Sequence, residues 1–177
     1  MEAIGLTGEV ACWEPEFIHN SRERTNVDMA WWDVNNGPTY CEVKLTEREF
    51  GPASEKTNED RRKYDEKRTE FYLPGLQGKC PDEFLERNFF LKNYQIFRNL
   101  WLATTSDKAT LVFLMPRANY RLWDQLNPIV DRLGDSLKSR IRIVAIEDVL
   151  KSLAIVHSPA WVSKYAMLLR AKYLLPT

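Results

Sequence analysis

Two charged residues interrupt an apolar, strand-like segment in the first third of the chain. The segment Tyr40-Cys41-Glu42-Val43-Lys44-Leu45 contains the only Glu-x-Lys triplet of the sequence. Because side chains alternate along a strand, Glu42 and Lys44 point to the same face. Such segments are normally covered in a folded protein, and a covered charge is costly unless it is paired or binds a metal. We therefore expect a fold in which this acid and this base form part of a charged site.

A β-hairpin is predicted just before and through this segment. The residues Asn35-Asn36-Gly37 lie between two runs rich in apolar residues, which is a strong signal for a tight turn between antiparallel strands. We expect the two strands over residues 26–34 and 39–46. The register of this hairpin decides which acidic residue lies beside the Glu-x-Lys triplet.

Two registers are open to the hairpin. A two-residue loop would place Asp28 opposite Leu45, on the wrong face of the sheet. A three-residue loop over 35–37, with its glycine left-handed, would place Asp28 opposite Lys44, so that Asp28, Glu42 and Lys44 share one face. We favour the second register because Pro38 would disturb tight pairing beside a two-residue turn.

The remaining pattern indicates alternating helices and strands. The mixed-sign charged stretch 47–70 is typical of a solvated helix or an extended insertion. A long helix is expected over 82–103, capped by Asp82. Further elements are expected as a first strand over 10–19 interrupted near Pro15, strands over 109–115 and 140–146, and helices over 119–133 (kinked or broken near Pro128), 147–154 and 159–173, the last beginning at Ser158-Pro159. This order predicts an α/β fold, a mixed β-sheet with helices on both faces.

Composition limits the class of protein. A length of 177 residues, with 44% hydrophobic and 28% charged residues, predicts one globular domain over 1–177. A formal net charge of zero argues against a dedicated sequence-independent nucleic-acid binder, but not against an enzyme with a basic groove. Three scattered cysteines predict reduced thiols and a cytoplasmic protein. No signal peptide or membrane-spanning segment is visible in the sequence.

The expected cluster has the residue types that phosphodiester hydrolysis requires. Magnesium is commonly bound by one or two carboxylates while it keeps several waters, and it can activate a water and neutralise a phosphate. Asp28 and Glu42 would supply the carboxylates, and the backbone carbonyl of Val43 could supply another oxygen. Lys44 would orient or help deprotonate the attacking water and offset developing negative charge.

The chain resembles the PD-(D/E)xK nuclease superfamily in Asp28, the hairpin and Glu42-Val43-Lys44. The flanking segments Thr25-Asn26-Val27-Asp28, Glu42 to Glu47, Phe50-Gly51 and Tyr94 to Leu100 resemble a bacterial family of restriction endonucleases within it. The resemblance covers about residues 8–150. It implies a restriction-endonuclease-like αβββαβ core, a Mg²⁺-dependent active site in which Mn²⁺ can substitute, and DNA as substrate.

The resemblance also assigns roles to single residues. It implies Asp28 and Glu42 as metal ligands, Lys44 as the catalytic lysine, and Gln95 as a polar helix residue facing the site. Glu14 or Glu16 could correspond to an additional acid. Val27 stands where the proline that names the motif is usually found. Little chain precedes the first strand, so the usual N-terminal helix is expected to be short or missing.

The favoured function is a Mg²⁺-dependent endonuclease that hydrolyses double-stranded DNA in restriction or defence. The alternative is a nuclease-fold module that binds nucleic acid or a protein partner without cutting. A third option keeps the enzyme but changes the substrate to branched or single-stranded DNA, or to RNA. Because two strands need two sites, a homodimer is one arrangement to consider.

Simpler interpretations apply to several other residues. The triplet alone could be a surface Glu–Lys pair. His19 and His157, the only histidines, are expected in packing or surface roles. Cys41 is expected to be a small buried hydrophobe behind the site. Trp31 and Trp32 alternate faces beside Asp28, and the tryptophans in general are expected in the core.

Overall fold

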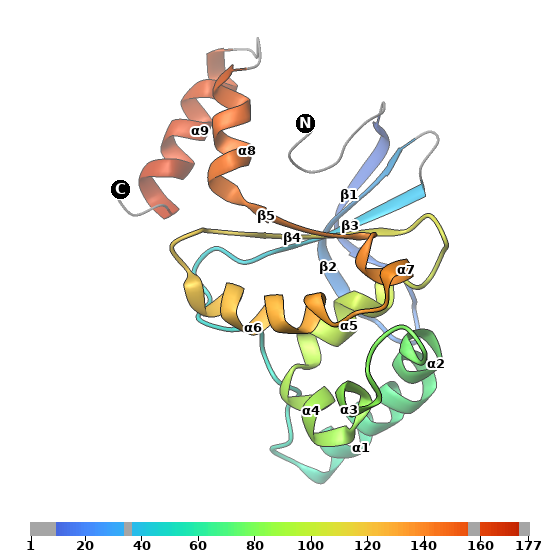
Figure 1. The fold of residues 1–177 in the computed structure, drawn as a ribbon. Helices are drawn as coiled ribbons and strands as arrows, with labels where there is room; N and C mark the ends of the chain where they lie inside the picture. The colour runs from blue at the N-terminus through green and yellow to red at the C-terminus, as the bar shows by residue number, and fades with distance from the viewer. Residues whose placement is uncertain (1–9, 34–36, 156–159, 174–177) are drawn as a thin grey trace.

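The computed structural model describes residues 10–33, 37–155 and 160–173, and its framework is a five-stranded mixed sheet (Figure 1). The strands lie in the order β1 (Val10–Ile18), β2 (Asn26–Asp33), β3 (Gly37–Val43), β4 (Thr110–Met115) and β5 (Ile141–Ala145). The first three strands are antiparallel, whereas β4 and β5 run parallel to β3. The predicted mixed α/β sheet is confirmed.

Helices lie on both sides of this sheet. Figure 1 shows α1 to α7 on one side and the α8–α9 pair on the other, next to the end of β5. The helical segments are α1 (Asn58–Lys67), the π-helical turn η2 (Arg68–Tyr72), α2 (Leu73–Leu76), α3 (Asp82–Leu85), α4 (Arg87–Lys92), α5 (Tyr94–Leu102), α6 (Tyr120–Asp131), α7 (Asp135–Lys138), α8 (Ile146–Ile155) and α9 (Ala160–Tyr173). In the described residues, no helix is both long enough and apolar enough to cross a membrane.

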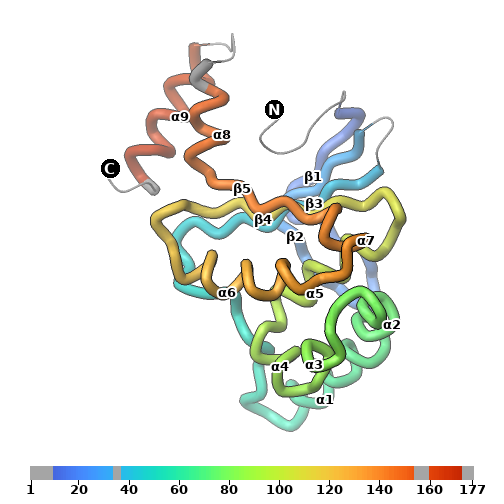
Figure 2. The backbone as a smooth tube through the Cα atoms, in the orientation of Figure 1, coloured from blue at the N-terminus to red at the C-terminus, as the bar shows by residue number. Residues whose placement is uncertain are grey.

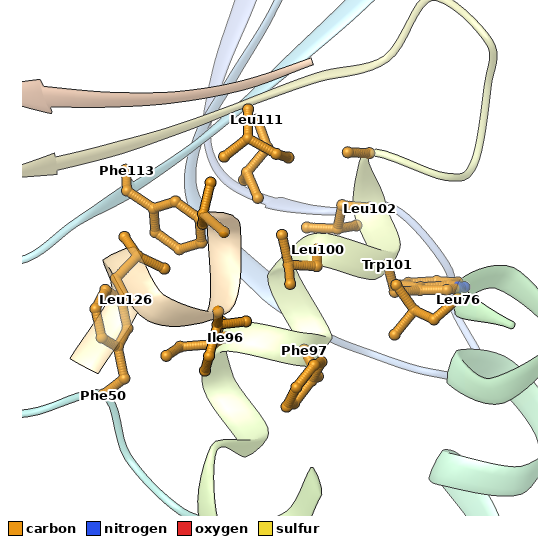
Figure 3. Packing of buried hydrophobic residues seen from close by; sticks show 14 of the residues in the cluster. Phe50, Leu76, Ile96, Phe97, Leu100, Trp101, Leu102, Leu111, Phe113 and Leu126 are labelled. Carbon is orange, nitrogen blue, oxygen red and sulfur yellow. The ribbon is translucent and has the colours of Figure 1, made fainter. Parts of the chain in front are cut away.

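Strand alternation separates two apolar clusters. On the side of α5 and α6, the strand residues Tyr40, Leu111 and Phe113 join the main core. Figure 3 shows this core closing between β4, α5, α6 and the loop that contains Phe50. On the opposite side of the sheet, a smaller cluster includes Cys41 and is completed by residues of β2, β4, β5 and α8.

The prediction of one continuous helix over 82–103 is wrong. The backbone becomes extended at Glu86 (ψ 139°) and leaves helical geometry again at Asn93 (φ −110°, ψ 30°), so α3, α4 and α5 are separate. Asp82 is the first residue of α3 and does not cap it with its side chain; Pro81 occupies the cap position. The breaks let the three short segments turn, and each of them buries apolar side chains in the core.

Other helix predictions differ less from the structure. The charged stretch contains α1, whose residues are not buried and whose first turn is capped by the Thr57 hydroxyl accepting from the Asp60 amide (3.0 Å). Helix α6 continues through Pro128. The short segments α2 and α7 and the π-helical turn were not predicted. Ser158-Pro159, and any helix before β1, lie outside the described residues.

The hairpin register is the feature that positions the site. Asp33 pairs with Gly37, so the three residues 34–36 connect β2 to β3. This loop begins one residue earlier than the predicted loop over 35–37, and residues 34–36 lie outside the described residues. Gly37 has a φ of +81°, and a Cβ there would lie 2.8 Å from Lys108 Cβ, which explains why glycine begins β3. Extending the register by one pair places Asp28 opposite Glu42 rather than Lys44. The partner of Asp28 on β3 thus moves by two residues, from Lys44 to Glu42. Because an even shift keeps side chains on the same face, Asp28 still lies on the face of Glu42.

Candidate active site

Asp28 is tied to the middle of the Glu-x-Lys triplet. Its Oδ2 accepts a hydrogen bond from the Val43 amide at 2.6 Å, and the side chain is half-buried. This bond holds a β2 carboxylate against the β3 backbone between Glu42 and Lys44. The predicted association of these three residues is therefore present in the structure, although the register that produces it differs.

Glu42 is a buried carboxylate with a cation at each oxygen. Its exposed fraction is 3%, and Lys44 Nζ lies 3.0 Å from Oε1. On the other side, Arg98 Nη2 of α5 lies 3.3 Å from Oε2. Burial of a carboxylate is tolerated only when such partners compensate for lost hydration. The site is therefore a three-residue charge cluster between β3 and α5.

Lys44 lies just beyond the end of β3 and is itself buried, with 7% of its surface exposed. Its amide donates to the Leu114 carbonyl of β4 (2.9 Å), which fixes the backbone beside the parallel strand. Its ammonium lies 3.8 Å from Glu47 Oε1 and 5.9 Å from the centroid of the Phe50 ring. The lysine is thus held between two carboxylates above an aromatic ring.

Glu47 was not predicted as a member of this site. Its Oε2 accepts from the amides of Leu45 and Thr46, each at 3.0 Å. Burial raises the pKa of the Glu47 carboxyl, but backbone hydrogen bonds and the Lys44 charge more than offset this and bring the pKa below its ordinary value. Glu47 is therefore a carboxylate at neutral pH. Its backbone carbonyl also accepts from Asn119 at the start of α6 (2.6 Å).

Gln95 contacts the loop that follows the site. Its side-chain Oε1 accepts from the Gly51 amide (2.8 Å), and its backbone amide donates to the Gly51 carbonyl (3.2 Å). Figure 2 shows this loop leaving β3 and passing α6 on its way to α1. Within the described residues, the Gln95 side chain hydrogen-bonds to Gly51 of this loop and not to Asp28, Glu42 or Lys44.

Arg98 is the α5 residue that reaches Glu42. From the sequence we would assign it a structural rather than a catalytic role. The available signal was its position three residues after Gln95, which places both on neighbouring parts of one helix face. The guanidinium also donates to Asn99 Oδ1 (3.3 Å from both Nε and Nη2), whereas the buried Asn99 Nδ2 has no hydrogen-bond partner among the described residues.

The two candidate acids on β1 do not join the carboxylate pair. Glu14 is exposed. Glu16 falls opposite Asp28 when the β1–β2 register is followed, but it has a φ of +51° and its carboxylate accepts from the Asn26 side-chain amide. Both residues therefore lie at the exposed edge strand rather than beside Glu42.

The simpler interpretations of Cys41 and His19 agree with the structure. Cys41 is buried on the opposite face of the sheet, and burial, reinforced by Asp28 and Glu42, raises the pKa of its thiol to about 12. His19 packs against aromatic rings, and burial lowers its pKa despite the nearby Glu23. His157 lies outside the described residues.

The donor set is suited to magnesium. Asp28 and Glu42 offer two carboxylates from adjacent strands. A larger ligand set is not available, because the described residues contain no group of three or more His, Cys, Asp or Glu side chains that could hold a metal. Two carboxylates suffice for Mg²⁺, which usually completes its shell with waters and substrate phosphate oxygens. The residues present fit such an ion better than they fit Zn²⁺, which prefers sulfur and nitrogen ligands.

The mixed sheet and its charged strand pair define the chain as an α/β protein of the restriction-endonuclease-like class. Residues 9–174 match the family described as "Restriction Endonuclease associating with ARP" (REase-ARP), and the chain belongs to that family. No curated protein and no solved structure matches the chain. The family thus agrees with the resemblance seen in the sequence.

Proposed function

We propose that this protein is a Mg²⁺-dependent endonuclease that hydrolyses phosphodiester bonds in double-stranded DNA, in restriction or defence. The supporting observation is the meeting of Asp28, Glu42 and Lys44 at the end of β3, with Lys44 Nζ 3.0 Å from Glu42. Membership of the REase-ARP family supports the same activity. The three cysteines are free thiols, which suits the cytoplasm as the place of action.

Each site residue has a role in this proposal. Asp28, Glu42 and the carbonyl of Val43 would hold the metal. When bound, Mg²⁺ lowers the pKa of a water and neutralises the phosphate. Lys44, held by Glu42 and Glu47, would orient the attacking water and offset the negative charge that develops on the phosphate. Gln95 would position the loop that places the Phe50 ring next to Lys44.

Plasmid cleavage tests the activity. With Mg²⁺ present, the wild-type protein should nick or linearise supercoiled DNA, and Lys44→Ala should lower the rate about a hundredfold or more. Lys138→Ala is the matched control because Lys138 pairs with Asp131 on the exposed surface (3.2 Å). Circular dichroism should show that both variants are folded. Cleavage by Lys44→Ala at the wild-type rate would refute the assignment.

A second candidate is a nuclease-fold module that binds nucleic acid or a protein without cutting. The specific observation that favours it is that both oxygens of Glu42 already face cations, Lys44 and Arg98. A wild-type protein that binds DNA but neither takes up Mn²⁺ nor cleaves in Mg²⁺ would support this candidate over the enzyme.

Cutting both strands also needs two sites, and a homodimer, testable by analytical ultracentrifugation, would supply them.

A further inference from the structure

A hollow of about 580 Å³ lies next to the candidate active site. It is formed by the segment after Glu47, the end of α4 and one side of α6. Its lining includes the apolar residues Phe89 and Ile129, and the exposed charged residues of the lining form its rim. None of these residues was assigned a role by the sequence or by the proposed function.

Three cationic side chains on this rim have no ion-pair or hydrogen-bond partner among the described residues. Arg48, Lys92 and Arg121 line the hollow and are exposed, and none forms an ion pair or hydrogen bond through its side chain with the part of the chain that the structure describes. Most other arginines are engaged; for example, Arg87 binds Asp65 and Glu55, and Arg132 binds Glu83. The rim thus gathers positive charge that the fold itself does not use.

The polar groups inside the hollow are, in contrast, already satisfied. The Gln125 carboxamide accepts from the Phe50 amide (2.8 Å) and donates to the Phe50 carbonyl and to Asn93 Oδ1 (each 3.3 Å). Asn93 in turn donates to the Phe89 carbonyl (3.1 Å). With both amides occupied, the hollow has no free amide pair to read a base edge. It offers charge, which suits a phosphate backbone.

The hollow is connected to the candidate active site through Phe50. Gln125 clamps the backbone of Phe50, while the Phe50 ring packs on Phe113 (centroids 5.4 Å apart) and lies beneath the Lys44 ammonium. Figure 3 shows Phe50 next to Leu126 of α6, on the side of the core where Phe113 of β4 also lies. Arg48 directly follows Glu47, which contacts Lys44. A strand bound at the hollow would therefore be continuous with one at Lys44.

We propose that Arg48, Lys92 and Arg121 bind phosphate groups of the DNA next to the phosphate that is cut, and so position the duplex without reading its sequence. The proposal rests on the proposed nuclease function and names a second contact surface for the same substrate. Two acids, Glu49 and Asp124, also line the rim and leave it with a net charge of +1, since three cations oppose two anions. These acids limit the affinity of the rim for phosphate.

Equilibrium binding of a fluorescent DNA duplex to the full chain, without divalent metal, tests the proposal. The triple variant Arg48→Ala/Lys92→Ala/Arg121→Ala should bind about tenfold or more weakly, and the salt dependence of log K should flatten by roughly 0.9 per lost phosphate contact. Asp124→Asn should tighten binding. The matched control Arg62→Ala/Arg132→Ala/Lys138→Ala removes the same charge from exposed pairs elsewhere and should change binding much less.

Equal weakening by both triple variants, or no weakening by the rim variant, would overturn the proposal. Thermal melting followed by circular dichroism should show that the rim variant is folded. The outcome is separate from that of the cleavage test. If the wild-type protein binds DNA through the rim but does not cut it, the nuclease function is contradicted and the role of the rim is retained. If the wild-type protein cuts DNA but the rim variant binds DNA as tightly as the wild type, the role of the rim is contradicted and the nuclease function is retained.

Discussion

Arg98 Nη2 lies 3.3 Å from Glu42 Oε2, on the opposite side of the carboxylate from Lys44. This pair links α5 to β3 through a buried charge. Because Glu42 is 3% exposed, its two cations are part of what makes its burial possible. The site is therefore organised by the protein itself, and a metal ion at Glu42 would have to share the carboxylate with Lys44 and Arg98 or displace one of them.

Removal of Arg98 should destabilise the fold. Breaking a buried ion pair from one side leaves an uncompensated charge, which typically costs about 3–5 kcal/mol. Because Glu42 keeps Lys44 as a partner, we expect a loss at or below the lower end of this range for Arg98→Ala in urea unfolding, and a smaller loss for Arg98→Lys. Arg62→Ala is the control, because its partner Glu66 is exposed and such pairs contribute about 0.2–1 kcal/mol. Equal effects of Arg98→Ala and Arg62→Ala would contradict the role given to Arg98.

Gln95 should act through the loop and not through the metal. In Gln95→Ala the part-buried Gly51 amide loses its acceptor, which should lower the free energy of unfolding by about 1–3 kcal/mol. DNA cleavage should fall because the loop positions Phe50 next to Lys44. Mn²⁺ affinity should stay at the wild-type value. A large loss of Mn²⁺ affinity in Gln95→Ala would show instead that the side chain takes part in the metal site.

A second buried acid, Glu23, should be essential for stability and dispensable for chemistry. Its side chain is fully buried, accepts from Thr25 and from the Tyr72 hydroxyl, and lies 3.3 Å from Lys67 Nζ. Glu23→Ala should therefore cost about 3–5 kcal/mol of unfolding free energy. The exposed Glu66→Ala should cost far less. A mild effect of Glu23→Ala would mean that the cluster rearranges around the lost carboxylate.

Thiol labelling should separate the three cysteines as the pH rises. Burial raises the pKa of Cys41 to about 12 and that of Cys80 to about 11, from an ordinary value of 9.0. Since the thiolate is the reactive form, only the exposed Cys12 should be alkylated rapidly by iodoacetamide when the native protein is labelled at pH 9.0, the ordinary thiol pKa.

The raised pKa of Cys41 also makes the stability of the fold depend on pH. The folded state keeps the Cys41 proton where the unfolded chain loses it, so this contribution to stability is present below pH 9.0 and is lost as the pH rises toward about 12. Cys41→Ala should therefore reduce the alkaline loss of stability, measured as the urea midpoint against pH. Rapid labelling of Cys41 in the folded protein would contradict its burial behind the site.

Much of the sheet could be predicted because strand alternation is a local property. The position of the Glu-x-Lys triplet on a covered strand follows from the apolar residues around it. The hairpin loop was misplaced by one residue because Gly37 and Pro38 are strong turn signals, yet here they begin β3 opposite Asp33 and Trp32. The even shift in register preserved the shared face of Asp28 and Glu42.

The breaks in the long helix and the cations of the site were beyond the reach of pattern alone. Glu86 and Asn93, where the helix breaks, are neither glycine nor proline, so packing in three dimensions and not local propensity ends α3 and α4. Arg98 on a helix looks like a solvated charge until α5 is docked on β3. Glu47 was hidden for the same reason, because its contact with Lys44 depends on the turn after the strand.

Binding of Mn²⁺, followed by electron paramagnetic resonance of the free ion, tests the central claim most directly. The wild-type chain should take up Mn²⁺ and release it to Mg²⁺, and Asp28→Asn should weaken uptake about tenfold or more, as expected when a carboxylate ligand of the ion is lost. Glu14→Gln, an exposed acid on the neighbouring strand, is the control and should bind as the wild type does. Equal Mn²⁺ binding by wild type and Asp28→Asn would contradict a metal site at Asp28 and Glu42.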